Sequence, residues 1–311
     1  MAISEQSPQA EARPWKVSRN VLEEHLTALL CISPWLIGFL AFEIGPILTA
    51  FWLSLTKYNI IKPAKFIGLS NYQEMLTTDK LFWQSLKVSA NYAAGSVILG
   101  IVLGVGLALL LNQNVRGIAF YRTGFYLPAV VSGVAVAYMW ILVLQQEGIL
   151  NAMLGFIGID GPNWLYTREW ALPAFILMSL WQVGGGMVLY LAGLQGVPTE
   201  LYEAASIDGA GRIAKFGNVT LPMISPVIFF NFIIGIIGSF QVFTGGFIIT
   251  KGGPVDATMF YVLHLYFKAF ESLRMGYGSA LGVVLFAIIM GLTYLSFRAS
   301  NRLVYYEGRL R

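Results

Sequence analysis

The sequence predicts an all-α membrane protein with six transmembrane helices, and three observations carry that prediction. Of the 311 residues, 57% are hydrophobic and only 12% are charged, whereas about a quarter of the residues in a typical soluble domain are charged. The mean hydropathy is +0.67, so the chain holds more apolar side chain than one globule can bury. The apolar residues form long continuous runs without the alternation of barrel strands.

Six runs are long enough to cross a hydrocarbon core, which takes about 20 helical residues. Because lipid offers no hydrogen bonds, each run is expected to satisfy its backbone as a helix. The predicted spans are residues 26–49, 88–111, 120–144, 171–195, 222–243 and 277–297. They form one domain, 26–297, between an N-terminal tail (1–25) that lacks signal-peptide features and a C-terminal tail (298–311).

Glycine and proline are frequent inside these runs. The spacing Gly100-x-x-x-Gly104 is typical of a helix-packing face, although membrane helices are rich in glycine in any case. The run Gly184-Gly185-Gly186 is more informative, because three residues without side chains weaken a helix and leave room for a bend or a cavity.

The positive charges favour both termini in the cytoplasm. With the N-terminus inside, the inner segments hold ten Lys and Arg residues against nine outside, a margin too small to fix the orientation alone. Eight of the eleven arginines do fall in the inner segments. The net charge of +4 is read as loop charge flanking the spans, and no nucleic-acid partner is expected.

The loop 196–222 between the fourth and fifth spans carries helix signals of its own. Pro198 and Thr199 suggest a helix start with Thr199 as N-cap, and Gly209 is a natural terminator. A second short helix is expected over residues 212–218. On the residues alone, this loop is either an amphipathic connector on the membrane surface or a docking element.

One gapped motif in this loop resembles a known signature. Glu203-Ala204-Ala205 is followed after three residues by Gly209, and after nine more by Val219-Thr220-Leu221-Pro222. This pattern resembles the EAA loop of the membrane permease subunits of binding-protein-dependent ATP-binding-cassette importers. The family pattern has Ile where this chain has Val219, which is a conservative difference.

The resemblance extends over nearly the whole chain to the sugar-permease branch typified by the maltose transporter. The segments that carry it are Phe66-Ile67-Gly68-Leu69-Ser70-Asn71-Tyr72, Phe120-Tyr121-Arg122 with Leu127-Pro128, Thr250-Lys251-Gly252-Gly253-Pro254 and Gly276-Tyr277-Gly278-Ser279-Ala280. The maltose subunit's extra N-terminal spans and large periplasmic insertion are absent. The match is therefore closer to minimal six-span first permeases.

This resemblance implies a type I importer permease fold in a prokaryotic inner membrane, with both termini cytoplasmic. It also implies four kinds of partner: a second permease, two ATPase subunits, an extracytoplasmic binding protein and a carbohydrate substrate. Residues 203–209 would form the coupling helix that docks on the ATPase. The residues expected to take part are Glu203, Ala204, Ala205, Asp208 and Gly209.

The sequence predicts no catalytic centre, metal site or cofactor. It contains no Gly-x-x-x-x-Gly-Lys-[Ser/Thr] motif, so ATP is expected to bind a partner subunit. Cys31 is the only cysteine, and His25 and His264 are each expected to be solvated residues at a membrane interface. Glu43 is the one acid within a predicted span, and local hydrogen bonding or snorkelling is the expected explanation.

Polar residues at mid-span depth are candidates for the substrate path. Such side chains are costly in a bilayer unless they are paired or face water, so each either bonds between helices or lines the path. The candidates are Ser132, Tyr138, Ser179, Gln182, Ser239 and Gln241, with Trp181, Tyr190 and Asn231 at similar depth. The resemblance places Ser179, Ser239 and Gln241 at or beside sugar-contacting positions.

Three other functions fit the sequence less well than a sugar importer does. A permease for glycerol phosphate or another anionic polyol needs a cation along the path, and no Lys or Arg lies at mid-span depth. An ion-coupled secondary transporter predicts paired intramembrane acids, and Glu43 has no partner acid in another span. A membrane scaffold without transport activity leaves the EAA spacing unexplained.

Overall fold

The computed structural model describes residues 19–305, and its internal contacts divide the chain into two units, residues 1–50 and 51–311. Residues 1–18 and 306–311, which hold most of the predicted N-terminal tail and part of the C-terminal one, lie outside the described part. By length and composition, five described helices could each cross a membrane, and one bent pair could make a sixth. These segments are Glu23–Ser54, Lys80–Leu111, Gly133–Phe156, Arg212–Phe240, Met275–Ser300 and the pair Arg168–Trp181 with Gly184–Gln195.

The first predicted span is longer than the sequence indicated. Helix α1 (Arg19–Phe39) continues through a π-helical turn, Leu40–Ile44, into α2 (Gly45–Ser54). The π turn lies directly before Pro46, whose ring nitrogen cannot donate a helical hydrogen bond, and such turns are a common response to proline in a helix. Glu43 lies within this turn and its side chain is exposed.

The second span also begins earlier than predicted, with α4 at Lys80–Leu111. Lys80 and Lys87 made residues 80–87 resemble a loop, but Asp79 caps the helix there. One carboxylate oxygen of Asp79 accepts hydrogen bonds from the amides of Leu81 (3.0 Å) and Phe82 (3.3 Å). Ahead of α4 lie α3 (Ser70–Thr77) and a two-stranded antiparallel hairpin of β1 (Thr56–Lys57) and β2 (Lys65–Phe66).

The third predicted span, 120–144, is not one continuous helix. It is divided into α5 (Ile118–Val130) and α6 (Gly133–Leu144), with Val131 and Ser132 in extended conformations between them. Pro128 removes a backbone donor from the last turn of α5, and Ser and Gly favour the start of a new helix. After α6, the apolar segment continues into α7 (Ile149–Phe156).

The fourth span is bent by 48° between α8 (Arg168–Trp181) and α9 (Gly184–Gln195). The predicted effect of the triple glycine is therefore confirmed. A Cβ on Gly184 would collide with the backbone carbonyl of Phe125 in α5, so only glycine lets the two helices approach this closely.

The chain then turns through α10 (Thr199–Ile207) and α11 (Arg212–Lys215) to the fifth span. The predicted second short helix, 212–218, is not separate. A π turn, Phe216–Thr220, joins α11 directly to α12 (Leu221–Phe240), and it lies just before Pro222.

The remaining chain forms a bent hairpin and the sixth span. The hairpin comprises a π turn at Gly246–Thr250, α13 (Tyr261–Tyr266) and a second π turn at Phe267–Glu271. The sixth span is α14 (Met275–Leu303), which includes the predicted residues 277–297.

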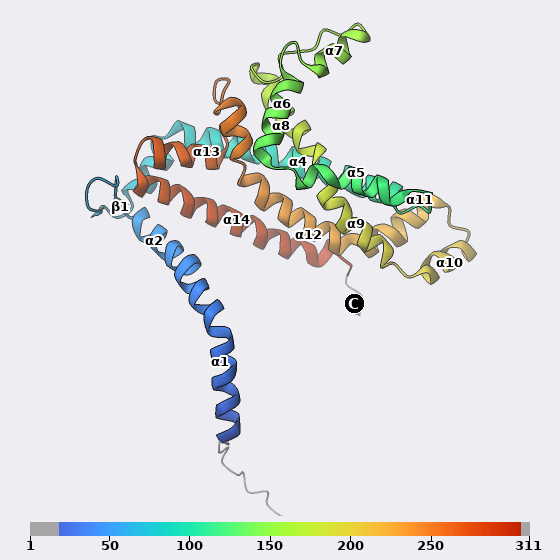
Figure 1. The fold of residues 1–311 in the computed structure, drawn as a ribbon, viewed down its shortest axis with the longest axis horizontal. Helices are drawn as coiled ribbons and strands as arrows, with labels where there is room; N and C mark the ends of the chain where they lie inside the picture. The colour runs from blue at the N-terminus through green and yellow to red at the C-terminus, as the bar shows by residue number, and fades with distance from the viewer. Residues whose placement is uncertain (1–18, 306–311) are drawn as a thin grey trace, which may run out of the picture. The chain divides into compact units, whose positions relative to one another are not determined.

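Helix α4 lies at the centre of the second unit and packs against α8, α9 and α12. Gly235 of α12 meets Val97 of α4, and Gly104 of α4 meets the ring of Tyr190 in α9. Gly100 meets no neighbour and lines a cavity instead, so the predicted glycine face serves packing at one position only. Figure 1 shows α10 and α11 at one end of α12 and α9, and β1 and α13 at the opposite end of the same bundle.

Candidate translocation cavity and coupling loop

A cavity of about 250 Å³ lies where α4, α8, α9 and α12 meet. Its polar lining is uncharged and comes from serine, asparagine and tyrosine side chains. These polar residues are Tyr92, Ser96, Ser179, Tyr190, Asn231 and Ser239. A polar, uncharged lining between apolar spans is suited to hydroxyl-rich or amide-bearing ligands.

A second cavity of about 180 Å³ adjoins the first. The two cavities share Tyr92, Ser179 and Val242 as wall residues. Gln182 and Thr244 add polar groups to the smaller cavity, together with the aromatic residues Trp140 and Phe175. Within the part of the chain that the structure describes, neither lining includes an Asp, Glu, Lys or Arg side chain.

Of the six path residues predicted from the sequence, three line the cavities and three do not. Ser179 lines both cavities, Ser239 lines the larger and Gln182 lines the smaller. Three others line neither cavity: Ser132 is exposed between α5 and α6, Tyr138 is 60% exposed on α6, and Gln241 is exposed just after α12. Tyr190 and Asn231 line the larger cavity, whereas Trp181 contacts Trp140 edge to face at 6.2 Å.

Sequence reasoning missed the contribution of α4, which places Tyr92 and Ser96 in the larger cavity. A signal for them exists in the sequence. Ser85, Ser89, Tyr92 and Ser96 recur at intervals of four, three and four residues, which puts them on one face of a helix. All four are buried in the structure. This polar stripe on a long apolar helix predicts a face turned toward the bundle interior.

The candidate coupling loop forms a helical corner between α10 and α11. Gly209 has a φ of +76°, the left-handed conformation that ends α10. The amide of Ala210 donates to the carbonyl of Ala205 at 2.8 Å, and that of Gly209 donates to Ser206 at 3.1 Å, which together form a Schellman motif. The predicted turn at Gly209 is therefore confirmed. The helix starts one residue earlier than expected, because Pro198 occupies the N-cap position and Thr199 is already helical.

Side chains tie this corner to the base of the fifth span. The hydroxyls of Tyr202 in α10 and Thr220 are hydrogen-bonded at 2.9 Å, and Lys215 donates to the hydroxyl of Ser206 at 2.6 Å. A displacement of α10 should therefore move the start of α12 with it.

The opposite side of the corner is exposed. Glu203, Ala204 and Asp208 are exposed, whereas Ala205 is half-buried. Two large apolar side chains stand beside them, Ile207 with 87% and Ile213 with 89% of its surface exposed. Exposed apolar side chains next to small and acidic ones are typical of a surface that docks a partner.

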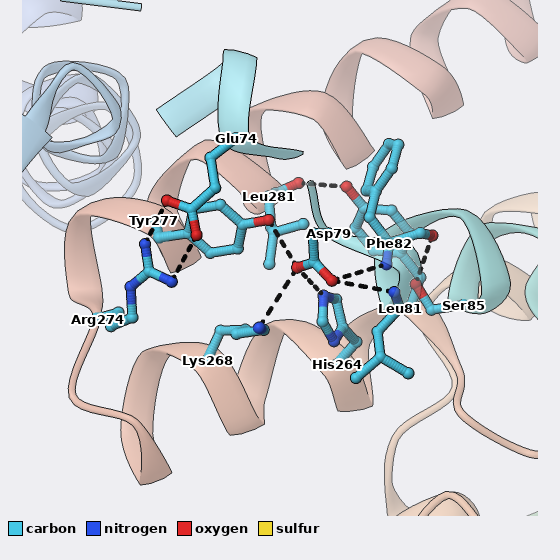
Figure 2. Close-up of polar contacts among 11 residues, drawn as sticks. Glu74, Asp79, Leu81, Phe82, Ser85, His264, Lys268, Arg274, Tyr277 and Leu281 are labelled. Atoms are coloured by element: carbon cyan, nitrogen blue, oxygen red, sulfur yellow. Dashed lines mark hydrogen bonds and ion pairs between the residues drawn. The ribbon is translucent and has the colours of Figure 1, made fainter. Parts of the chain in front are cut away.

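At the other end of the bundle, a buried ionic cluster surrounds Asp79, as Figure 2 shows. The carboxylate oxygen that does not cap α4 accepts a hydrogen bond from the Tyr277 hydroxyl at 2.7 Å. The same oxygen lies 3.1 Å from Nε2 of His264 and 3.4 Å from Nζ of Lys268. The cluster therefore joins the N-terminus of α4 to α13, to the π turn Phe267–Glu271 and to α14.

The environment of Asp79 favours its ionised form. Burial on its own raises the pKa of this carboxyl, but the Tyr277 hydrogen bond and the nearby His264 and Lys268 outweigh it, and the net pKa is lowered. Beside this cluster, both oxygens of Glu74 accept hydrogen bonds from Arg274 (2.8 and 2.6 Å). That bidentate hydrogen bond is the main reason why the pKa of Glu74 is lowered.

The expectation of a solvated His264 is wrong. The residue is 1% exposed, and burial lowers its pKa even though Asp79 favours the protonated form. No local sequence pattern indicates this contact, because His264 and Asp79 are 185 residues apart. Within residues 19–305, no group of three or more His, Cys, Asp or Glu side chains could hold a metal ion.

A bundle of apolar helices, a polar cavity between them and a rigid surface corner together define a subunit of a membrane transport pathway. Comparison with known proteins gives the family. Residues 97–305 match the model of the binding-protein-dependent transport system inner membrane component family. The chain belongs to this family, which consists of transport components and not of enzymes. It is therefore an integral protein of a prokaryotic inner membrane.

Similar proteins extend the match to most of the chain. It is 42% identical to the probable ABC transporter permease protein YesP of Bacillus subtilis, over 94% of this chain and 96% of that protein. It is 35% identical to the trehalose/maltose transport system permease protein MalF of Thermococcus litoralis, over 85% and 90% of the two chains.

A solved structure shares the fold. It is a chain of a bacterial alginate ABC transporter in complex with an alginate pentasaccharide-bound periplasmic protein. The TM-score is 0.80 with 22% sequence identity, and the match covers 93% of this chain and 98% of that chain. The predicted fold class, an all-α type I importer permease, is confirmed by this likeness.

Proposed function

We propose that this permease forms half of the translocation pathway for a neutral sugar or oligosaccharide in an ATP-binding-cassette importer. The observation that carries the proposal is the uncharged polar lining of the two adjoining cavities. Serine, asparagine and glutamine side chains can donate to and accept from sugar hydroxyls, and tyrosine and tryptophan rings can cover the apolar faces of sugar rings. The name of the trehalose/maltose relative supports the same substrate class.

The partners of the proposed importer are a second permease, two ATPase subunits and an extracytoplasmic binding protein. The family description and the solved complex with a periplasmic protein support this assembly. ATP binding and hydrolysis are assigned to the separate ATPase subunits, because this sequence has no phosphate-binding loop. The permease itself is proposed to carry no cofactor.

The corner at residues 199–209 is proposed to be the coupling helix. Glu203 would anchor it to the ATPase, with Asp208 beside the turn and Ala204 and Ala205 small enough for close docking. The hydrogen bond between Tyr202 and Thr220 and that from Lys215 to Ser206 support a rigid transfer of motion to α12. Since α12 carries Ser239 and Asn231, this motion would reach the cavity.

An anionic substrate such as glycerol phosphate is the weaker candidate. A buried anion needs a cation or several strong donors to replace its hydration. The linings of these two cavities, as the described residues form them, hold no lysine or arginine. The neutral class is therefore favoured.

The orientation proposed here puts both termini and residues 196–221 in the cytoplasm. Cysteines introduced at Thr78 and Ile207, both exposed, test it in a Cys31→Ser background. In intact cells, an impermeant thiol reagent should label Thr78→Cys and spare Ile207→Cys. Labelling of both, or of Ile207→Cys alone, would overturn this orientation.

The substrate class is tested in vesicles that contain the whole transporter and its binding protein. Uptake of neutral sugars (glucose, maltose, trehalose) is compared with uptake of glycerol 3-phosphate and a uronic acid trisaccharide. We expect ATP-dependent uptake of at least one neutral sugar and none of the anions. Uptake of an anion in preference to every neutral sugar would refute the neutral substrate class.

A further inference from the structure

Tyr92 of α4 is the tyrosine that lines both cavities. It is only 8% exposed and shares the dividing wall with Ser179 and Val242. The path residues predicted from the sequence all lie outside α4.

The surroundings of Tyr92 hold its ring in one place. The ring of Phe260 meets it edge to face at 5.3 Å, and Phe260 in turn meets Phe175 at 5.2 Å. One turn further along α4, the Ser96 hydroxyl donates to the Tyr92 carbonyl at 2.7 Å, and it lies 3.2 Å from the Ser239 hydroxyl of α12. The Phe260 contact restricts the ring and the Ser96 hydrogen bond anchors the backbone that carries it, so the Tyr92 side chain can act as a partition.

The size and chemistry of the two cavities suggest what the partition separates. Volumes of about 250 and 180 Å³ are below the roughly 300–1,000 Å³ of sites for drug-sized ligands. Each cavity therefore has room for a single sugar ring. The larger offers Ser96 and Asn231 to hydroxyls, and the smaller offers Gln182 and the ring of Trp140.

We propose that Tyr92 is a specificity-determining residue that separates two adjoining single-ring subsites of the sugar path. Its ring stacks on one sugar ring, and its hydroxyl binds a sugar hydroxyl at the junction of the subsites. A disaccharide then spans the wall formed by Tyr92, whereas a monosaccharide occupies one side. This inference rests on the proposed function and adds α4 to the helices that select the substrate.

Accessibility tests the position of Tyr92 without knowledge of the sugar. In a Cys31→Ser background, Tyr92→Cys is compared with Ser85→Cys, which lies two turns away on the same helix face, is fully buried and lines neither cavity. The probe is a small water-soluble methanethiosulfonate, applied to the complete transporter. Modification of Tyr92→Cys but not of Ser85→Cys is expected. Failure to modify Tyr92→Cys would overturn the inference.

Uptake tests the contact with sugar. The probe is whichever of glucose, maltose, trehalose and maltotriose the unaltered transporter takes up fastest. Tyr92→Phe, which keeps the ring, should raise KM about fivefold or more because a hydroxyl partner is lost. Tyr72→Phe is the matched control, since its hydroxyl bonds Ser54 outside both cavities.

Tyr92→Ala should merge the subsites and change the ratio of disaccharide to monosaccharide uptake about tenfold, a typical pocket discrimination. An unchanged KM in Tyr92→Phe together with an unchanged ratio in Tyr92→Ala would overturn the inference while the proposed function stands. If the unaltered transporter takes up no sugar in the panel, the proposed function fails. In that case, the modification of Tyr92→Cys is the remaining test of whether position 92 lines a water-filled path.

Discussion

The hydroxyl of Tyr277 donates a 2.7 Å hydrogen bond to the carboxylate of Asp79, 198 residues earlier in the chain. Asp79 also caps the N-terminus of α4, so one buried carboxylate fixes the start of the second span to the start of the sixth (Figure 2). His264 of α13 and Lys268 of the π turn that follows α13 lie against the same carboxylate. The start of α4 thus meets a segment that lies about 185 to 200 residues later in the chain, at the end of the bundle opposite the candidate coupling loop (Figure 1).

Neutralising this carboxylate should destabilise the protein strongly. Asp79→Asn leaves the Lys268 ammonium without its counter-charge and weakens the Tyr277 hydrogen bond, and breaking a buried pair typically costs about 3–5 kcal/mol. Glu74→Gln is the matched control, because the Glu74–Arg274 pair is more than a third exposed and such pairs contribute about 0–1 kcal/mol. The midpoint of thermal unfolding in detergent measures both. Equal shifts in the two variants would contradict this account of Asp79.

Stability should fall on mild acidification because of His264. Its folded-state pKa lies below the ordinary value of 6.5. As the pH drops below 6.5, the unfolded chain therefore takes up a proton that the folded chain does not, and folding loses free energy. The lowered pKa of Asp79 adds a further loss only below its ordinary value of 3.8. Unfolding midpoints between pH 7.5 and 5 measure the effect.

The matched variant for this pH profile is His264→Gln, which keeps a side-chain amide donor near Asp79 but does not titrate. It should be less stable at pH 7.5 and lose less stability between pH 7.5 and 5 than the unaltered protein. Profiles of the same slope in both proteins would rule out His264 as the titrating group.

The approach of α9 to α5 should tolerate no side chain at Gly184. A Cβ there would collide with the Phe125 carbonyl, whereas one at Gly185 would lie in ordinary contact, 3.5 Å from the Ala129 Cβ. Gly184→Ala should therefore lower the unfolding midpoint or the yield of folded protein, and Gly185→Ala should do neither. Size-exclusion profiles in detergent measure the yield of folded protein, and unfolding curves measure the midpoint. A well-folded Gly184→Ala protein of unchanged stability would show that α5 can shift without cost.

Proline at Gly209 should disrupt the turn of the candidate coupling loop, whereas proline at Gly211 should leave it intact. Proline fixes φ near −65°, which is incompatible with the +76° of Gly209 and compatible with the −71° of Gly211. We expect Gly209→Pro to abolish ATP-dependent uptake while the spans still insert, and Gly211→Pro to retain it. Uptake is measured in vesicles at matched expression. Normal uptake in Gly209→Pro would mean that the loop is only a connector.

Much of the fold could be predicted because an apolar run determines its own helix, and a glycine determines the bend or turn at its own position. The bend at Gly184 and the turn at Gly209 each follow from the residues that form them. Helix boundaries were harder, because Lys80 and Lys87 read as loop residues until Asp79 is seen to cap α4. The interruption at Val131 and Ser132 was missed, since one serine and one glycine (Ser132 and Gly133) do not end a run that is apolar again from Val134 to Leu144.

Cavity residues could be predicted only where their position on one helix face determines whether they point into the bundle. Ser179 and Ser239 line the cavities as their depth indicated, and the α4 face with Tyr92 could have been read from its polar spacing. Gln241 was not placed there, because α12 ends just before it and its side chain lies at the surface. The Asp79 cluster depends on contacts between residues about 185 to 200 positions apart, which no local pattern reports.

Sugar uptake by the complete transporter decides whether this chain carries a neutral sugar under the control of a separate ATPase. The complete transporter is reconstituted into vesicles with its binding protein outside, and uptake of maltose and trehalose is followed with ATP or a non-hydrolysable analogue inside. We expect uptake of at least one of the two sugars that requires both ATP hydrolysis and the binding protein. Uptake that persists without ATP and follows an imposed ion gradient would contradict it.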